Sequence, residues 1–185
     1  MENKYKFEKY KNLLCEWSKR MNLVASSTLN DIDNRHIADS AQLAKYLPAD
    51  VDIIDLGSGA GFPGVVLAIL GWNVTCIESI AKKVKFLTAV KQELNLDNLT
   101  IYHGRVENYI AQLPRNNKYI FTARAFASLT KILNYVGSTE YELFLLKGRD
   151  VMFEVDAAKQ QYHFDFELFP STTGDGFIMI VKKAK

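Results

Sequence analysis

A glycine-rich turn directly behind a short apolar run constrains this 185-residue chain more than any other feature. Residues 51–56 are followed by "GSGAGFPG", which holds four glycines within positions 57–64. Glycine allows the tight turn and the close backbone approach with which an open α/β sheet binds a ligand at the carboxyl ends of its strands. The stretch therefore predicts a strand, a ligand-binding turn and a helix, in that order.

Strand-like and helix-like segments alternate after Pro48. The strands are too apolar to keep one face in water, which is typical of a parallel sheet covered by helices on both faces. Near the carboxyl end, residues 162–168 and 177–181 flank a turn at 173–176 and predict an antiparallel hairpin. The other expected strands are 51–56, 74–78, 99–103, 119–124 and 142–147, and the expected helices are 63–70, 81–94, 106–113 and 129–136.

Two amphipathic helices precede this alternation. Residues 1–20 place apolar side chains at helical spacing and carry an excess of lysine and arginine, and a second helix is expected over residues 31–47, with Pro48 as its stop signal. We therefore expect a helical N-terminal extension over residues 1–48 and one α/β domain over residues 49–185.

Composition excludes several classes of protein. The net charge is only +2, and Cys15 and Cys76 lie far apart without metal-like partners, so we expect neither a disulfide framework nor a metal site. The longest apolar stretch, residues 62–70, is far shorter than the roughly 20 residues of a membrane span. The charged start "MENKYKFEKYK" lacks the apolar core of a signal peptide. These features predict a cytoplasmic protein without membrane contact, with a monomer as the default.

The glycine spacing by itself leaves the ligand open. Positions 59, 61 and 64 fit the G-x-G-x-x-G pattern of dinucleotide-binding folds, whereas positions 57, 59 and 61 fit a G-x-G-x-G pattern. Two hypotheses are therefore open: an NAD-binding oxidoreductase, and a methyltransferase that binds S-adenosylmethionine. A degenerate, non-catalytic RNA-binding module is a third alternative.

Asp55 discriminates between the two cofactors. It lies two positions before Gly57, where its carboxylate would repel a pyrophosphate and would favour the sulfonium and ammonium groups of S-adenosylmethionine. Pro63 lacks the N–H that a phosphate-binding helix would offer. Glu78, at the end of the next strand, is placed to accept ribose hydroxyls, which both cofactors contain. The loop therefore favours S-adenosylmethionine.

Several segments in order resemble the GidB/RsmG family, bacterial methyltransferases that methylate N7 of a guanine in small-subunit (16S) ribosomal RNA. They are "LLCEWSKRMNLVA", "NRHIADSAQL", "DLGSGAGFPGVVLAI", "ESIAKKVKFL", "GRVENY", "ARAFASL" and "LLKG". The resemblance implies a class I S-adenosylmethionine-dependent methyltransferase fold, Rossmann-like, with a mostly parallel seven-stranded sheet and an antiparallel C-terminal strand. It also implies 16S rRNA, or an assembly form of the small subunit, as the partner.

The resemblance assigns cofactor contacts to Gly57, Phe62, the pair Val106 and Glu107, and Arg124. For the arginine, a clamp on the methionine carboxylate, a contact to the target nucleotide and a structural ion pair all stay open. Ala123 stands where the family usually has serine, and an arginine common before the final strand is absent. The full expected cofactor-binding set is Asp55, Gly57, Gly59, Phe62, Glu78, Val106, Glu107 and Arg124.

No catalytic acid or base is expected, because guanine N7 carries a lone pair and no proton, so that transfer needs alignment above all. His36 and Asp39 are spaced to share one helix face, where either a functional or a helix-packing role is open. RNA contacts are expected from positive segments, without a choice among them. These segments are the first helix, Lys82, Lys83 and Lys85, Arg105, and the C-terminal lysines.

Overall fold

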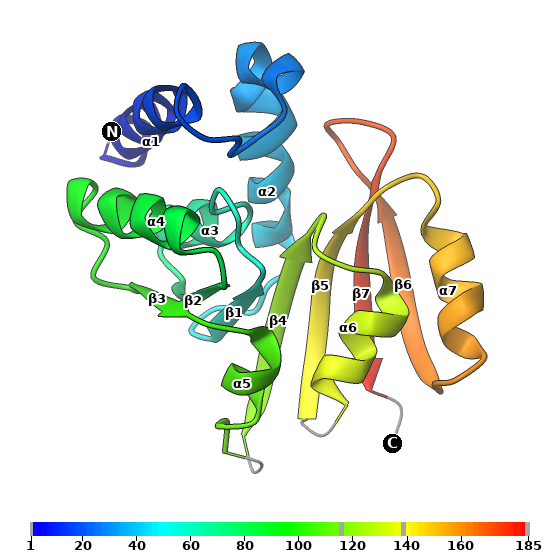
Figure 1. Ribbon diagram of the computed structural model, residues 1–185. Coiled ribbons are helices and arrows are strands. Elements are labelled where there is room, and N and C mark those ends of the chain that lie inside the picture. The colour runs from blue at the N-terminus through cyan, green and yellow to red at the C-terminus, as the bar shows by residue number, and fades with distance from the viewer. Residues whose placement is uncertain (1, 115–116, 138–139, 184–185) are drawn as a thin grey trace.

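The computed structural model describes residues 2–114, 117–137 and 140–183, and in these ranges the strands form a seven-stranded sheet in the order β3-β2-β1-β4-β5-β7-β6 (Figure 1). Strand β7 is antiparallel to β5 and to β6, and the other pairings are parallel. This confirms the expected mostly parallel sheet with its antiparallel C-terminal strand. The strands are β1 (Asp52–Leu56), β2 (Asn73–Glu78), β3 (Leu99–His103), β4 (Lys118–Arg124), β5 (Glu140–Lys147), β6 (Phe164–Pro170) and β7 (Phe177–Lys183).

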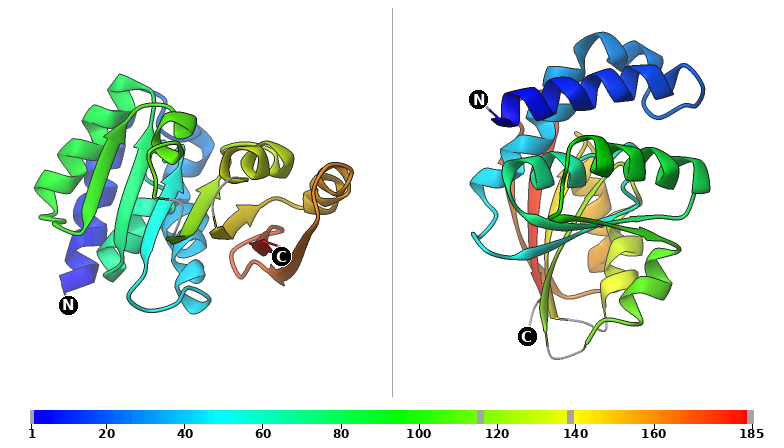
Figure 2. Two further views of the ribbon diagram at one scale, coloured as in Figure 1. Left: turned by 90° about the horizontal axis from the view of Figure 1, so that it is seen from below. Right: turned by 90° about the vertical axis from the view of Figure 1, so that its left-hand side faces the viewer.

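Helices cover both faces of the sheet, as the apolar strands predicted (Figure 2). Successive side chains of a strand point to opposite faces, so Ile53 joins one apolar cluster and Ile54 the other. The first cluster lies under α3 (Gly64–Leu70) and α4 (Ala81–Glu93). The second lies under α5 (Val106–Ile110), α6 (Leu129–Val136) and α7 (Val151–Lys159).

Helix α1 (Glu2–Ser18) packs across α3 and α4 rather than on the sheet itself (Figure 2). Tyr10 is fully buried in this contact, and its hydroxyl donates a 2.6 Å hydrogen bond to the carbonyl oxygen of Ala60 in the glycine turn. Leu14 and Phe86 are buried in the same cluster. Helix α1 thus shares a core with the sheet and fastens the glycine turn.

The second N-terminal helix is less regular than the expected single helix over residues 31–47. A 3-10 turn, η1 (Ser26–Asp31), leads into a π-helical stretch, η2 (Asp33–Ala38), and this is followed by α2 (Asp39–Ala41) and η3 (Gln42–Lys45). Wide turns of this kind redirect carbonyl oxygens and side chains away from regular helical positions. Here they face the end of β4, as described below.

The sequence pattern does not predict helix α7 (Val151–Lys159). Its buried residues Val151, Val155 and Ala158 do have helical spacing, but Met152 and Phe153 are 48% and 77% exposed and blur the apolar period. None of the helices in the described ranges is long and apolar enough to cross a membrane.

Candidate active site

The strands that end at the centre of the carboxyl edge divide it by charge. Strand β1 carries Asp55 near its end and β2 ends at Glu78, whereas β4 ends at Arg124 and β5 at Lys147. These four strands are parallel, so their carboxyl ends meet at one edge. We call the ends of β1 and β2 the acidic half and the ends of β4 and β5 the basic half.

Asp55 lies fully buried beneath the glycine turn. Its Oδ2 accepts a 3.1 Å hydrogen bond from the backbone N–H of Gly64, and the thiol of Cys76 lies 3.9 Å from the same oxygen. Among the described residues, its Oδ1 has no hydrogen-bond partner. Burial raises the pKa of Asp55 to about 6, against the opposing backbone hydrogen bond from Gly64, while the hydroxyl of Ser58 donates to the main-chain carbonyl oxygen of Asp55 at 3.1 Å. Such an unpartnered, buried carboxylate oxygen is suited to a cationic ligand group.

The glycines of the turn are required for different reasons. Gly57 has a φ of +67°, and a Cβ there would lie 2.2 Å from the ring of Phe126. Gly59 has a φ of +58°, but a Cβ there would find only Gly57 O at 3.9 Å and Lys83 Nζ at 4.0 Å. At Gly64 a Cβ would lie 2.6 Å from the Asp55 carboxylate and from Sγ of Cys76, so close packing requires this glycine. The surface above Gly59 is therefore the open part of the turn.

Glu78 ties the turn to the end of β2. Its Oε2 accepts the N–H of Gly59 at 2.9 Å, and its Oε1 accepts the N–H of Ile80 at 2.8 Å. A carboxylate has about four lone-pair sites, so both oxygens still have capacity for hydroxyl donors. The predicted ribose contact is compatible with this arrangement and stays a prediction.

Val106 and Glu107, at the start of α5, lie beside the acidic half. The N–H of Gly104 donates to the carbonyl oxygen of Glu78 at 3.0 Å, which joins the start of α5 to the end of β2. Val106 is buried and Glu107 is exposed in the first turn of α5. An apolar wall beside an exposed acceptor matches the expected adenine contact, which stays a prediction.

Arg124, at the end of β4, is held by the irregular N-terminal segment. Its guanidinium donates to the carbonyl oxygen of Arg35 at 2.9 Å and to Oδ2 of Asp39 at 3.1 Å. It also donates to Nδ1 of His36 at 2.5 Å. Of the roles left open for Arg124, the ion pair with Asp39 is thus present. The same contacts give His36 and Asp39 a role that their spacing alone left undecided.

Phe62 is buried in the same cluster rather than at the surface of the turn. Its ring stacks on His36 at 4.9 Å between centroids, and the Arg124 guanidinium lies 5.0 Å from its centroid. Burial, and next the charge of Arg124, lower the pKa of His36 to about 4. His36 is therefore neutral at pH 7, with Nδ1 accepting from Arg124 and Nε2 2.8 Å from the hydroxyl of Thr28.

The basic half opens into a cavity of about 480 Å³ between the N-terminal segment, the ends of β4 and β5, and the turn between β6 and β7. Lys147 lines it and donates to Glu154 at 2.7 Å and to the carbonyl oxygen of Ala127 at 3.1 Å. The hydroxyl of Thr173 donates to Oδ1 of Asp39 at 2.9 Å and so fastens the β6–β7 turn to α2. The cavity is large enough for a nucleotide base and offers groups of both charges.

Three residues of this edge were not singled out from the sequence. Phe126 covers Gly57, Ala125 has a φ of +52°, and Lys147 closes β5. The first two lie in "RAFASL" and the third in "LLKG", segments in which the family resemblance assigns a role only to Arg124. Among the described residues, no group of three or more His, Cys, Asp or Glu side chains is arranged to hold a metal ion.

Seven strands in this order, with a glycine turn after β1 and acidic residues at the ends of β1 and β2, define a class I S-adenosylmethionine-dependent methyltransferase fold. The chain belongs to the family described as rRNA small subunit methyltransferase G, whose model matches residues 3–173. This membership supports the methyltransferase interpretation of the glycine turn over the NAD-binding alternative.

Curated relatives carry the same description over most of their length. Ribosomal RNA small subunit methyltransferase G of Bartonella tribocorum is 39% identical, over 89% of this chain and 78% of the relative. The proteins of that name from Dinoroseobacter shibae and Rickettsia prowazekii are 39% and 36% identical, over 90% and 94% of this chain and 88% and 91% of their own.

Solved structures share the fold at low sequence identity. A mutant of MtNAS in complex with S-adenosylmethionine superposes with a TM-score of 0.64 at 14% identity, over 99% of this chain and 76% of that one. Precorrin-6y C5,15-methyltransferase from Geobacter metallireducens gives 0.58 at 12% identity, over 89% and 92%. An rRNA methylase from Streptococcus thermophilus gives 0.54 at 14% identity, over 79% and 94%.

Proposed function

We propose that this protein transfers a methyl group from S-adenosylmethionine to N7 of a guanine in small-subunit (16S) ribosomal RNA. The observation that carries the proposal is the unpartnered oxygen of Asp55 beneath the open glycine turn, in a chain of the methyltransferase G family. A buried carboxylate that faces a cation gains Coulomb energy in a low-dielectric site, whereas one that faces a pyrophosphate loses it.

The acidic half would hold the cofactor. Asp55 would lie beneath the methionine group of S-adenosylmethionine, and Gly59 leaves room for the cofactor. Glu78 has free lone pairs for the ribose hydroxyls. S-adenosylmethionine supplies an already activated methyl group when it is bound. The proposed cofactor-binding residues are Asp55, Gly57, Gly59, Phe62, Glu78, Val106, Glu107 and Arg124, of which Phe62 and Arg124 would act from the cluster with His36.

The basic half would hold the target nucleotide. Its cavity borders Arg124 and Lys147, which are paired with Asp39 and Glu154 and whose N–H groups suit the guanine O6. N7 needs no deprotonation, so the chain has to align the base and exclude water rather than move a proton. We accordingly assign no side chain as a catalytic acid or base.

The proposal also covers the form of the substrate, the compartment, the oligomeric state and the domain organisation. The substrate would be 16S rRNA or an assembly form of the small subunit, and the protein would act in the cytoplasm as a monomer without a metal. Residues 1–48 would form an extension of the methyltransferase domain at residues 49–185, and it would position Arg124 through Asp39.

The test is methylation of small-subunit rRNA from a strain that lacks this gene, with labelled S-adenosylmethionine and mapping of the modified nucleotide. We expect one labelled guanine whose label is lost by the chemistry that cleaves at 7-methylguanine. Label on another atom or base would overturn the N7 assignment, and no label on any rRNA or subunit would overturn the function. In a parallel thermal-shift measurement, S-adenosylhomocysteine should stabilise the protein and NAD should not.

A further inference from the structure

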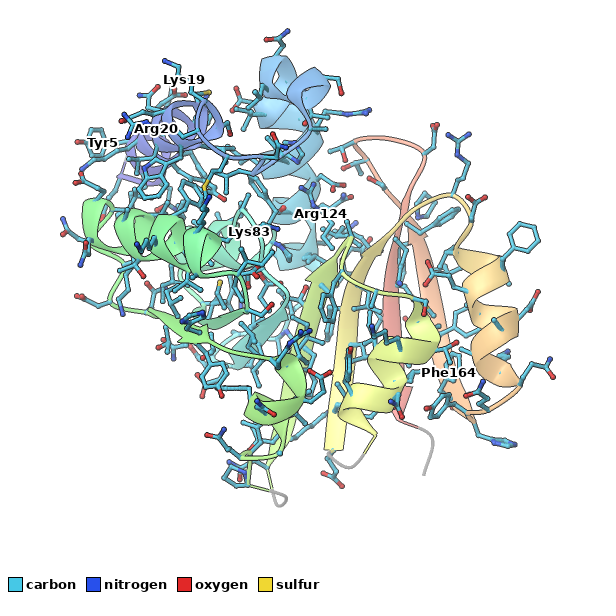
Figure 3. The ribbon with its side chains drawn as sticks, in the orientation of Figure 1. Tyr5, Lys19, Arg20, Lys83, Arg124 and Phe164 are labelled. Atoms are coloured by element: carbon cyan, nitrogen blue, oxygen red, sulfur yellow. The ribbon has the colours of Figure 1, made fainter. Side chains whose placement is uncertain are left out.

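A second recess lies outside the carboxyl-edge cavity, between the end of α1 and the first turns of α4. Its volume is about 300 Å³, and it is formed by side chains from both helices. Figure 3 shows Lys19 and Arg20 at this end of α1, above the start of α4. The lining residues are Glu16, Trp17, Arg20, Met21, Lys82 and Lys85. We call it the α1–α4 groove.

The cations of the groove lack acidic partners. Among the described residues, Arg20, Lys82 and Lys85 form no ion pair, although Glu16 lines the same recess. Lys82 and Lys85 lie three positions apart and so share a helix face. Their positions at the start of α4 oppose the helix dipole, at a cost of a few tenths of a kcal/mol each. Positive charge is thus concentrated here without internal compensation.

The first half of α1 shows the opposite arrangement. Lys6 pairs with Glu2 at 2.8 Å, and Lys9 pairs with Glu93 at 2.9 Å. Lys11 pairs with Glu8 and with Asp33. Three lysines of α1 are therefore neutralised, whereas Arg20, just beyond the end of the helix, is left available in the groove, which points to an anionic ligand there.

The floor of the groove is aromatic and held in place. Trp17 packs edge-on against the buried Phe86, with 5.6 Å between ring centroids, yet Trp17 itself remains half-buried. A partly open indole surrounded by cations is the arrangement with which proteins bind single-stranded nucleic acid, because bases stack on the ring while phosphates contact the cations. An acidic peptide would use the charges and leave the stacking surface unused.

The groove adjoins the proposed cofactor site. Lys83, on the same turn of α4 as Lys82, reaches the glycine turn, where its Nζ lies 4.0 Å from the position of a Cβ on Gly59. The first turns of α4 therefore present Lys82 and Lys85 to the groove and Lys83 to the glycine turn. One RNA segment in the groove would thus adjoin the proposed cofactor site.

We propose that the α1–α4 groove binds an unpaired segment of the substrate rRNA, with phosphates on Arg20, Lys82 and Lys85 and a base stacked on Trp17. This inference rests on the proposed function for the identity of the RNA. It selects one surface among the positive segments of the chain and adds an aromatic contact to it.

The test compares RNA binding by charge-matched variants. Lys82→Gln combined with Lys85→Gln removes two charges from the groove. Lys118→Gln combined with Lys159→Gln removes two charges from the opposite end of the sheet. This control double variant therefore has the same net charge as the groove double variant. Protein-free 16S rRNA and small subunits from the deletion strain are the probes. We expect the groove pair to weaken binding of both at least tenfold and to lower the slope of log affinity against log salt by about 0.7 to 0.9 per lost contact. The control pair should change neither.

Trp17 is tested separately, because it also packs on Phe86. Trp17→Leu should weaken RNA binding roughly tenfold, the effect of losing one stacked base, whereas Trp17→Phe should restore most of it. Affinity for S-adenosylhomocysteine should be unchanged in all groove variants, which reports an intact fold. Trp17→Leu binding RNA as the wild type does would overturn the stacking contact.

The failures of the two proposals are distinguishable. Wild-type protein that binds rRNA through the groove but methylates none would overturn the proposed function alone. If the wild-type protein methylates rRNA but the groove double variant and the control double variant bind RNA with equal affinity, only the assignment of the groove as an RNA site is overturned. A groove pair that loses affinity for small subunits but not for protein-free rRNA would show a ribosomal protein as the occupant and would also overturn this inference.

Discussion

The acidic and basic halves of the carboxyl edge are built in different ways. In the acidic half, Asp55 and Glu78 accept hydrogen bonds from backbone N–H groups of the glycine turn itself. In the basic half, Arg124 is held by residues 85 to 89 positions away in the N-terminal segment. The carboxylates of the first half are thus bound by residues at most 19 positions away, although Tyr10 also bonds to Ala60, whereas the second half exists only when distant segments have packed.

This difference follows the chemistry that each half would serve. A small cationic cofactor needs a rigid, pre-formed cradle, and a loop stiffened by its own carboxylates provides one. A large anionic substrate needs a wide opening bordered by cations, which the N-terminal segment and the β6–β7 turn provide together. Substitutions in the two halves should therefore have different signatures: loss of cofactor binding in the acidic half, and loss of stability and of RNA handling in the basic half.

The largest effect is expected from Gly57→Ala in the acidic half. The alanine Cβ would have to adopt a left-handed φ of +67° and would lie 2.2 Å from Phe126. We expect cofactor affinity to fall by about 100-fold or more, since each 1.4 kcal/mol is a factor of ten. Gly71→Ala is the matched control, because Gly71 also has a positive φ, of +114°, but no atom within 4 Å of the added Cβ. Calorimetric titration with S-adenosylhomocysteine measures both, and equal affinities would refute the prediction.

Asp55→Asn should separate charge from shape in the same half. The amide keeps the size of the side chain and removes the negative charge, so we expect affinity for S-adenosylmethionine to fall about 30-fold and affinity for S-adenosylhomocysteine, which lacks the sulfonium charge, to fall less. Stability at pH 7 should rise by roughly 2 kcal/mol, because a buried carboxylate with a pKa raised to about 6 is costly when ionised. Asp52→Asn, at the exposed start of β1, is the control for both measurements. A decrease in stability would contradict this account.

Arg124→Gln should weaken the basic half, because it removes the side chain that holds the irregular N-terminal segment and contacts Phe62. It leaves the Arg35 carbonyl, Asp39 and His36 without their shared donor, at an expected cost of about 2 kcal/mol in the free energy of unfolding. Lys118→Gln, at the other end of β4, removes a surface ion pair with Glu142 and should cost less than about 1 kcal/mol. Denaturant unfolding measures both, and equal costs would show that the N-terminal segment is held elsewhere.

Lowering the pH should change the contributions of Asp55 and His36 to folding stability in opposite directions. The raised pKa of Asp55 means that its contribution to folding stability is fully present below about 3.8 and is lost as the pH rises through about 6. The lowered pKa of His36 means that its contribution is present above about 6.5 and is lost as the pH falls through about 4. Cofactor affinity should drop about fivefold between pH 6 and pH 5 as Asp55, with its pKa of about 6, takes up a proton. Titrations of the wild type and Asp55→Asn across this range decide it, since only the variant should give a flat profile.

The smallest effect is expected from Thr173→Val in the β6–β7 turn. Loss of the 2.9 Å hydrogen bond to Asp39 should cost about 1 kcal/mol. Thr172→Val is the neighbouring control, because its hydroxyl makes only a 3.4 Å contact with Gln42. Unfolding midpoints measure both, and a larger cost at Thr172 would place the tether at Gln42 instead.

Much of the fold follows from local sequence signals. Strands that are apolar on both faces are found in the predicted places, because a strand covered on both sides must be apolar at every position. The mixed helix types of residues 33–45 and the missed helix α7 show the limit. In the first case contacts with Arg124 accompany the wide turns, and in the second the exposed Phe153 hides the period.

The sequence by itself determined the acidic half: a strand, Asp55, the glycines and Glu78 stand in chain order, and their spacing reflects hydrogen bonds between the loop and the ends of its two neighbouring strands. Only the tertiary structure decided what Arg124 contacts, that Phe62 is buried against His36, and that Trp17 meets Lys82 and Lys85 in one groove. The physical reason is that these contacts join segments far apart in the sequence. Local pattern constrains only what a residue meets within its own turn or strand, whereas packing of α1 and the N-terminal segment against the domain determines the rest.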